Sequence, residues 1–417
     1  MQPKTLPAAA LVAALAAALP GAVAAQTPPE LIGLSAAAAT TRVVRQDWTD
    51  CTTTGCATLL AAPTAANAGG TAYDATRGVV WIANGLLLEA VDPVSCRVVC
   101  GPQSLPATGA GVRITGLAVV EAAGVMLVAA SDNSILEYRL ACPISTLVRR
   151  CDATPALPSG HSIGGIATDD VGDLVAFSSS DFQNPAAPGN VIHVARRGAP
   201  CSPICRIPVP ACGTTRLGPL TGVAFDPCRN VLWATDGSAT VGLRIGGPAL
   251  CGPVQQVQCC DFPGPGRFVG LAVAPSRATA VGTNCTSQGC PNCPQMAHRS
   301  VGDAALGNPS FALELVNAPA GARVAMWINA GPCNPGGPIV PPFCGPVLVP
   351  IAPPPVVVSL GTGPGLGCSG AVQVPLPIPL DPALCGGVLS SQCFGICTTG
   401  LVGTFVSNCL SWQVTGS

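Results

Sequence analysis

The sequence predicts an all-β protein, a five-bladed β-propeller followed by a small β-sandwich domain, and three observations lead to that prediction. The 417 residues include 49 glycines and 44 prolines, which form turns and interrupt helices. Charged residues make up only 9% of the chain, too few to cover the exposed faces of long amphipathic helices. A glycine followed by two short apolar strands recurs five times. Many short strands are therefore expected.

Residues 1–25 are expected to be a secretory signal peptide. Lys4 precedes an apolar stretch from Leu6 to Leu19, and small residues from Ala22 to Ala25 follow Pro20-Gly21. This is the order of the basic, apolar and cleavage regions in such signals. About 14 apolar residues are too few to cross a bilayer of roughly 30 Å, so we expect an exported chain, secreted or held at the cell surface. Prolines interrupt the later apolar stretch 338–360, so no transmembrane segment is expected there.

Residues 26–290 are expected to form the propeller. In each of five repeats a glycine precedes a short apolar strand, a turn and a second apolar strand. Repeats of roughly 40–50 residues are typical of propeller blades. A loop-forming insert, 181–189, explains the longer third interval. The repeat glycines are Gly70, Gly116, Gly165, Gly222 and Gly270, which are spaced 46, 49, 57 and 48 residues apart.

The N-terminal segment is expected to close the ring of blades. The fifth strand pair has no third strand after it, whereas residues 41–56 supply one before the first repeat. We therefore expect strands near 41–48 to pair with those that follow Gly270, a closure that leaves no sheet edge exposed. Asp47 stands four residues before Cys51, just as Asp92 stands four residues before Cys96 in the first repeat. This match indicates that the N-terminal segment is the outer half of the last blade.

All 23 cysteines follow the predicted signal, and in an exported protein we expect them to form disulfides. The odd number leaves at least one thiol unpaired within the chain. A close cysteine pair follows the third strand of a blade, where it could staple the outer hairpin of that blade. Cys290-Pro291-Asn292-Cys293 lacks the strand and helix of a redox motif, so a structural disulfide role is favoured there. The expected bridges are Cys51 with Cys56, Cys96 with Cys100, Cys142 with Cys151, Cys201 with Cys205, and Cys251 with Cys259 or Cys260.

The fourth repeat carries a family resemblance. It reads G-V-A-F-D-P from Gly222 and N-V-L-W-A-T-D-G from Asn230, and it resembles the blades of NHL and SMP-30/gluconolactonase-like propellers. The resemblance extends over the repeat region and implies a propeller fold. It brings no catalytic motif with it.

The chain changes character from about Pro294. Residues 307–322 (G-N-P-S-F-A-L-E-L-V-N-A-P-A-G-A) and 375–384 (P-L-P-I-P-L-D-P-A-L) are similar to a C-terminal β-sandwich domain found at the end of many large bacterial extracellular proteins. This resemblance implies a β-sandwich over 291–417 together with secretion or surface attachment. The cysteine-rich stretch 385–409 departs from it.

Polar residues at the ends of the second strands are candidates for a ligand or metal site. Equivalent positions would bring them to one face of the propeller, where carboxylate and amide oxygens could hold a hard divalent cation. Asn84-Gly85 and Asp236-Gly237 are also the pairs preferred in two-residue hairpin turns, and this turn role is favoured. The candidates are Asn84, Ser131 or Asp132, Asp181, Asp236 and Asn284.

Two further motifs have a structural and a functional interpretation. Gly160-His161-Ser162-Ile163-Gly164 matches the G-x-S-x-G of a hydrolase nucleophile, but that motif needs a helix after the serine, and here another apolar strand follows. A loop between repeats is favoured, with His161 as a candidate ligand contact. Trp81 and Trp233 occupy matching places in second strands, where we expect core packing rather than a sugar-stacking surface.

Composition and motifs together favour a non-catalytic function. The formal net charge is −1, and the absence of a basic tract argues against a nucleic-acid partner. We expect a role in extracellular binding or surface structure, with no cofactor and with a carbohydrate or protein as the unidentified ligand. The alternatives are a metal-dependent, lactonase-like hydrolase that uses a divalent cation, and a carbohydrate-binding protein that uses exposed aromatic residues.

Overall fold

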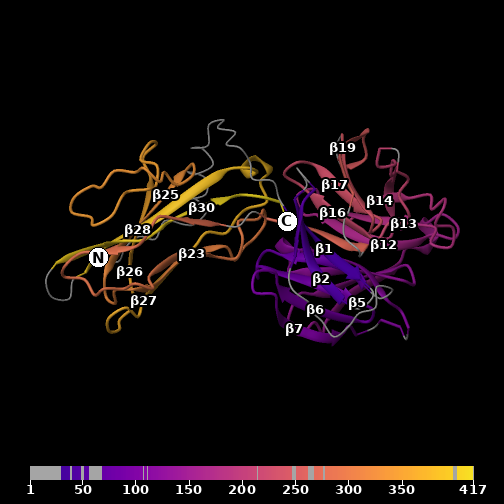
Figure 1. Ribbon diagram of the computed structural model, residues 1–417. Coiled ribbons are helices and arrows are strands. Elements are labelled where there is room, and N and C mark those ends of the chain that lie inside the picture. The colour runs from indigo at the N-terminus through magenta and orange to yellow at the C-terminus, as the bar shows by residue number, and fades with distance from the viewer. Residues whose placement is uncertain are drawn as a thin grey trace. The chain divides into compact units, whose positions relative to one another are not determined.

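A computed structural model describes residues 30–416 except 38–39, 48–50, 56–67, 107, 110, 214, 247–249, 262–266, 276–277 and 398–401. The expected signal peptide lies outside the described residues. The chain divides into two compact units after Pro275, earlier than the boundary at 290 expected from the sequence. Both units consist mainly of β-strands (Figure 1). Among the described residues, no helix is long and apolar enough to cross a membrane.

The first unit contains four-stranded antiparallel sheets. In every sheet but the last one, neighbouring strands are consecutive in the chain. The first sheet is β4 (Ala68–Asp74), β5 (Val79–Asn84), β6 (Leu87–Asp92) and β7 (Arg97–Ser104). The second is β8 (Ile114–Val120), β9 (Val125–Ala130), β10 (Ser134–Arg139) and β11 (Leu147–Asp152). The third is β12 (Ser162–Asp169), β13 (Leu174–Ser180), β14 (Val191–Arg196) and β15 (Pro203–Pro208). The fourth is β16 (Gly222–Asp226), β17 (Val231–Thr235), β18 (Ala239–Ile245) and β19 (Val254–Asp261).

The fifth sheet combines both ends of this unit, but not with the strands expected. Its order is β20 (Arg267–Ala274), β1 (Glu30–Ala37), β2 (Thr40–Asp47) and β3 (Thr53–Gly55). The segment near 41–48 was expected to pair with the strands after Gly270, yet β2 pairs with β1, and β1 pairs with β20. Residues 278–284 were expected as the second strand and instead belong to the other unit. Leu31, Ile32 and Leu34 are buried, so β1 packs on both faces of this sheet.

The five repeat glycines lie on the first strand of each sheet, where neighbouring sheets approach most closely. A Cβ atom placed on any of them would lie 2.3 to 2.9 Å from the backbone nitrogen of the residue after the next repeat glycine. Real Cβ atoms do not approach a backbone so closely, so only glycine fits there. The contacts run from Gly70 to Leu117, Gly116 to Ile166, Gly165 to Val223, Gly222 to Leu271, and Gly270 to Thr71.

Disulfides join neighbouring sheets, and the expected pairing within each outer hairpin is wrong. Cys100 bonds to Cys142, Cys151 to Cys201, Cys205 to Cys251, and Cys51 to Cys260. In each case one sulfur belongs to an outer strand and the other to the turn before the outer strand of the following sheet. A further bridge joins Cys212 to Cys259. Cys96 is also disulfide-bonded, whereas Cys56 lies outside the described residues.

Hairpin register explains why the close pairs do not bond. Cys142 lies at the tip of the hairpin between β10 and β11, but Cys151 faces Ile135 at the far end of the same hairpin. A disulfide requires Cα atoms within roughly 7 Å. The Cα atoms of Cys151 and Cys201 are 6.1 Å apart, because the tip of the next sheet reaches the outer strand.

The second unit has two sheets. The larger contains β21 (Thr279–Val281), β22 (Cys285–Thr286), β25 (Arg323–Ala330), β26 (Val356–Gly361), β28 (Val388–Cys397), β29 (Gly403–Val406) and β30 (Cys409–Gln413). The smaller joins β23 (Ala297–Val301), β24 (Ala312–Ala318) and β27 (Gly370–Pro375). Side chains of the two sheets meet, since His298 of β23 hydrogen-bonds Ser391 of β28.

Disulfides also cross-link the second unit. Cys290 bonds to Cys397 and Cys293 to Cys368, so the C-x-x-C cysteines pair with distant partners rather than with each other. Two further bridges of this unit join Cys285 to Cys344 and Cys333 to Cys409. Cys393 is free and buried, in keeping with the odd number of cysteines.

Candidate functional site

Three of the predicted polar residues, Asp132, Asp181 and Asp236, lie in connections between second and third strands, where neighbouring groups satisfy their carboxylates. Asp236 follows β17; its Oδ1 accepts hydrogen bonds from the backbone nitrogens of Ser238 and Ala239, both at 2.8 Å. Its Oδ2 accepts one from the nitrogen of Gly218 at 2.7 Å. Asp236 therefore holds both its own turn and the loop that leads into β16.

The carboxylate of Asp132, in the second sheet, also has both oxygens engaged by neighbouring groups. Its Oδ1 accepts hydrogen bonds from the nitrogen and hydroxyl of Ser134, at 3.0 and 2.6 Å. Its Oδ2 pairs with Arg150 at 2.7 Å on the neighbouring strand. The turn interpretation of these residues agrees with the observed contacts.

Asn84 and Asn284 do not extend this arrangement. Asn84 ends β5, but its side chain lies outside the described part of the structure. Asn284 belongs to the second unit, so its expected equivalence to Asp236 is wrong. Within the described residues, no group of three or more His, Cys, Asp or Glu side chains could hold a metal ion.

His161 and Asp181 belong to a polar cluster of the third sheet that sequence analysis found only in part. Ser179 Oγ lies 3.2 Å from His161 Nδ1 and 2.8 Å from His193 Nε2, so one hydroxyl bridges two imidazoles. Asp181 accepts hydrogen bonds from the backbone nitrogens of Gln183 and Asn184 in its own turn. Burial lowers the pKa of His161, although the nearby Asp181 carboxylate opposes this.

The bridge is placed by strand alternation. Phe177 and Ser179 are two residues apart on β13 and share a face, and His193 lies opposite Phe177 on β14. The His193 ring stacks on Phe177 with the centroids 4.9 Å apart. Burial, together with the positive charge of Arg206, lowers the pKa of His193 to about 4, so the ring is neutral near pH 7. Ser179 and His193 are fully buried, so a substrate has no access to the hydroxyl.

The G-x-S-x-G segment does not form a nucleophile elbow. Ser162 begins β12, and the strand continues to Asp169 without the helix that the elbow requires. Trp81 and Trp233 are 0% and 1% exposed, which confirms the core position and removes them as a sugar-stacking surface.

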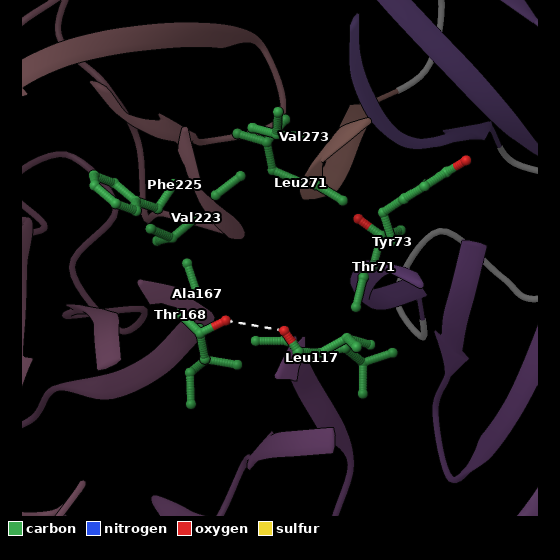
Figure 2. Close-up of a pocket in the computed structure, with 15 residues that line it drawn as sticks. Thr71, Tyr73, Leu117, Ala167, Thr168, Val223, Phe225, Leu271 and Val273 are labelled. Atoms are coloured by element: carbon green, nitrogen blue, oxygen red, sulfur yellow. Dashed lines mark hydrogen bonds between the residues drawn. The ribbon is translucent and has the colours of Figure 1, made fainter. Parts of the chain in front are cut away.

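The first strands surround a narrow axial cavity (Figure 2). Its volume is about 40 Å³, and its lining is mainly apolar. Ligand pockets usually span roughly 300–1,000 Å³, so this space suits a few water molecules rather than an organic ligand. Thr168 donates a hydrogen bond to the carbonyl of Val119 at 3.0 Å (Figure 2). The lining consists of the three residues after each repeat glycine: 71–73, 117–119, 166–168, 223–225 and 271–273.

Two acidic residues directly follow first strands: Glu121 comes after β8 and Asp170 after β12. Both have raised pKa values. Burial, with a smaller contribution from the Asp74 carboxylate, raises the pKa of Glu121 to about 7. Burial likewise raises the pKa of Asp170 to about 6. Glu121 hydrogen-bonds the turn between β4 and β5 through Ala75 and Thr76, so it links two sheets. No local sequence signal marks these two acids, because their role depends on contacts between repeats.

Comparison with known proteins adds two remote likenesses. No protein-family model and no curated protein sequence matches the chain. Among solved structures, a chain of a nidogen/laminin complex is 14% identical, with a TM-score of 0.37, covering 59% of this chain and 98% of that one. The β-propeller domain of Cps50 (Swd1) from Myceliophteria thermophila is 18% identical, with a TM-score of 0.30, covering 48% of this chain and 60% of that one.

Proposed function

We propose that this chain is an exported, disulfide-stapled scaffold with a non-catalytic role in extracellular binding or surface structure. In this proposal the first unit is a closed five-bladed β-propeller, and the second is a β-sandwich. Residues 1–25 act as the signal peptide that directs export. The likeness of the fourth repeat to NHL and SMP-30/gluconolactonase-like blades accords with this architecture.

Contacts between the first strands support a closed ring. Each repeat glycine lies close to the backbone of the next sheet. Gly270 lies close to Thr71, which follows Gly70 in the first sheet. A sheet shared by β1 and β20 joins the two ends of the repeat region. Such closure removes the unpaired sheet edges that would otherwise promote aggregation.

The observation that carries the proposed function is the set of disulfides between neighbouring sheets. The bonds of Cys100 to Cys142, Cys151 to Cys201, and Cys205 to Cys251 close loops of 42 to 50 residues. In the chain-entropy model a loop of this length contributes about 4 kcal/mol to stability. Such bonds persist in oxidising compartments and are rare in the cytosol. A protein fastened in this way suits prolonged exposure outside the cell.

The side-chain contacts favour a scaffold over the lactonase alternative. The oxygens of Asp132 and Asp236 accept hydrogen bonds from turn nitrogens, as expected of turn residues. The axial cavity of about 40 Å³ is too small for a lactone substrate. Binding is therefore assigned to surfaces outside the axis.

The test is a disulfide map of the exported protein. The full chain would be expressed with its own first 25 residues, collected from the culture medium or cell surface, and digested without reduction. We expect peptides that link Cys151 to Cys201 and Cys205 to Cys251, and an N-terminus at residue 25 or 26. Retention in the cytosol with reduced cysteines, or bridges within single hairpins, would refute the proposal.

A matched pair of variants tests the contribution of the bridges to stability. Replacing Cys151 and Cys201 together by alanine should lower the unfolding free energy by about 4 kcal/mol. Cys393→Ala removes an unbridged thiol and should cost only about 1 kcal/mol, from lost packing. Equal losses in the two proteins would show that the bridge is not what stabilises the scaffold.

A further inference from the structure

The second unit contains a groove that is large enough for an organic ligand. Its volume is about 800 Å³, within the range of roughly 300–1,000 Å³ that is usual for ligand pockets. One wall comes from residues 280–286 and the other from residues 292–299, and Asn408 lies between them. All of these residues belong to the second unit.

Two asparagine side chains hold the walls together. The Asn408 amide accepts a hydrogen bond from the backbone nitrogen of His298 and donates one to its carbonyl, both at 2.9 Å. It thus pairs with β23 as a neighbouring strand would. Asn284 accepts a hydrogen bond from the nitrogen of Asn408 at 2.7 Å and donates one to the carbonyl of Met296. The groove is therefore formed before any ligand binds.

Disulfides fix both walls. Cys285 in the first wall bonds to Cys344, and Cys293 in the second bonds to Cys368. A wall held in this way loses little conformational freedom on binding, and that preserves affinity. The rigidity argues for a preformed site rather than a chance gap between loops.

The groove offers uncommitted polar groups without net charge. Thr283, Thr286 and Asn292 line it, and their side chains make no hydrogen bond within the described part of the chain. Each can both donate and accept. Arg299 is the one permanently charged lining residue, and it forms an ion pair with Glu314. Because its charge is matched and the lining includes no carboxylate, the groove suits neither a free anion nor a metal cation.

We propose that this groove binds a neutral saccharide, an inference that rests on the extracellular binding role proposed above. Sugar hydroxyls both donate and accept hydrogen bonds, which matches the two threonines and Asn292. The apolar faces of a sugar ring can pack on Pro294 and Ala280, two exposed residues that also line the groove. The saccharide therefore meets polar groups at its edge and apolar surface at its face.

Isothermal titration calorimetry on the full exported chain tests this inference. The probes are the neutral hexasaccharides of cellulose, starch, chitin and xylan, with a heparin hexasaccharide and an uncharged decapeptide as comparisons. We expect one neutral saccharide to bind with a Kd below about 1 mM. Asn292→Ala and the isosteric Thr286→Val should each weaken that binding by roughly tenfold. Gln373→Ala is the control, because it removes an exposed amide of β27 outside the groove.

Several results would overturn the inference. These are no binding of any neutral saccharide, tighter binding of heparin or of the peptide, or saccharide binding that both groove variants leave unchanged. The disulfide map of the same sample separates this failure from failure of the scaffold proposal. If the bridges between sheets are present and no saccharide binds, only the groove assignment is wrong.

Discussion

Glu121 accepts a hydrogen bond from the backbone nitrogen of Ala75 at 2.5 Å, although the two residues follow strands of different sheets, β8 and β4. The second carboxyl oxygen accepts one from the Thr76 hydroxyl at 2.6 Å. An acid at the end of β8 therefore closes the turn between β4 and β5. Glu121 is only 4% exposed, so its protonation is coupled to the stability of the contact between the sheets.

The first prediction is a pH-dependent effect of Glu121→Gln. Because burial raises the pKa of Glu121 from 4.5 to about 7, the folded chain retains a proton that the unfolded chain has released. The stabilisation is complete below pH 4.5 and is lost as the pH rises through 7. The neutral variant should match the wild type near pH 4.5 and exceed it above pH 7 by up to about 3 kcal/mol. Unfolding midpoints at pH 4 to 8 measure this, and a pH-independent difference would contradict it.

The second prediction concerns the repeat glycines. In Gly165→Ala the new Cβ would lie 2.8 Å from the backbone nitrogen of Val223, and backbone atoms cannot give way cheaply. We expect a loss of at least about 2 kcal/mol, or failure to fold. Gly198→Ala is the control from the same sheet, because its Cβ would meet no atom within 4 Å. Urea unfolding compares the two variants, and similar midpoints would refute the close contact between the sheets.

The positions of the repeat glycines and the first strands could be predicted from the sequence, because a glycine before an apolar run is a local signal. The disulfide pairing could not be predicted from the sequence. Spacing along the chain favours pairs of nearby cysteines, but the hairpin register places such cysteines at opposite ends of a hairpin. Cys100 faces Ala90 within its own sheet, yet it bonds to Cys142 of the next one. That choice depends on how neighbouring sheets meet, which no single repeat encodes.

The candidate sites could also be predicted only where a local sequence signal exists, and not where they depend on contacts between distant segments. The turn role of Asp236 follows from the Asp-Gly pair, but its bond to Gly218 depends on a loop 18 residues earlier. β1 was missed because Leu31, Ile32 and Leu34 are buried without polar alternation, so the segment lacks the usual pattern of a half-buried strand. The groove walls meet through Asn284 and Asn408, which lie 124 residues apart.

The third prediction uses two neighbouring buried serines. His298 Nδ1 donates a hydrogen bond to the carbonyl of Glu314 at 3.1 Å, so Nε2 must accept the one from Ser391, at 2.6 Å. Burial lowers the pKa of His298 to about 4, which keeps the ring neutral for this role near pH 7. Ser391→Ala leaves Nε2 unsatisfied and should cost about 1–3 kcal/mol.

Ser390→Ala is the matched control for that loss. Ser390 is also fully buried, but its hydroxyl makes no hydrogen bond to any described residue. Its removal should be nearly neutral. Chemical unfolding at pH 7 measures both variants. If Ser390→Ala proves as costly as Ser391→Ala, lost packing rather than the histidine contact would explain the effect.

The last prediction separates a turn residue from a metal ligand at Asp236. In Asp236→Asn an amide can still accept from Ser238 and Ala239, but its NH₂ group would then face the Gly218 nitrogen 2.7 Å away. Two donors would meet, so we expect a loss of about 1–2 kcal/mol. Asp132→Asn weakens an ion pair at a partly exposed site and should cost less than about 1 kcal/mol.

Calorimetric titration with calcium, magnesium and zinc completes the comparison of these two aspartate variants. The carboxyl oxygens of Asp236 are already engaged by backbone nitrogens, so a cation would have to displace those hydrogen bonds. We therefore expect the wild type and both variants to give the same heats. Tight binding by the wild type that Asp236→Asn abolishes, with no loss of stability, would identify a metal ligand and favour the lactonase alternative over the scaffold.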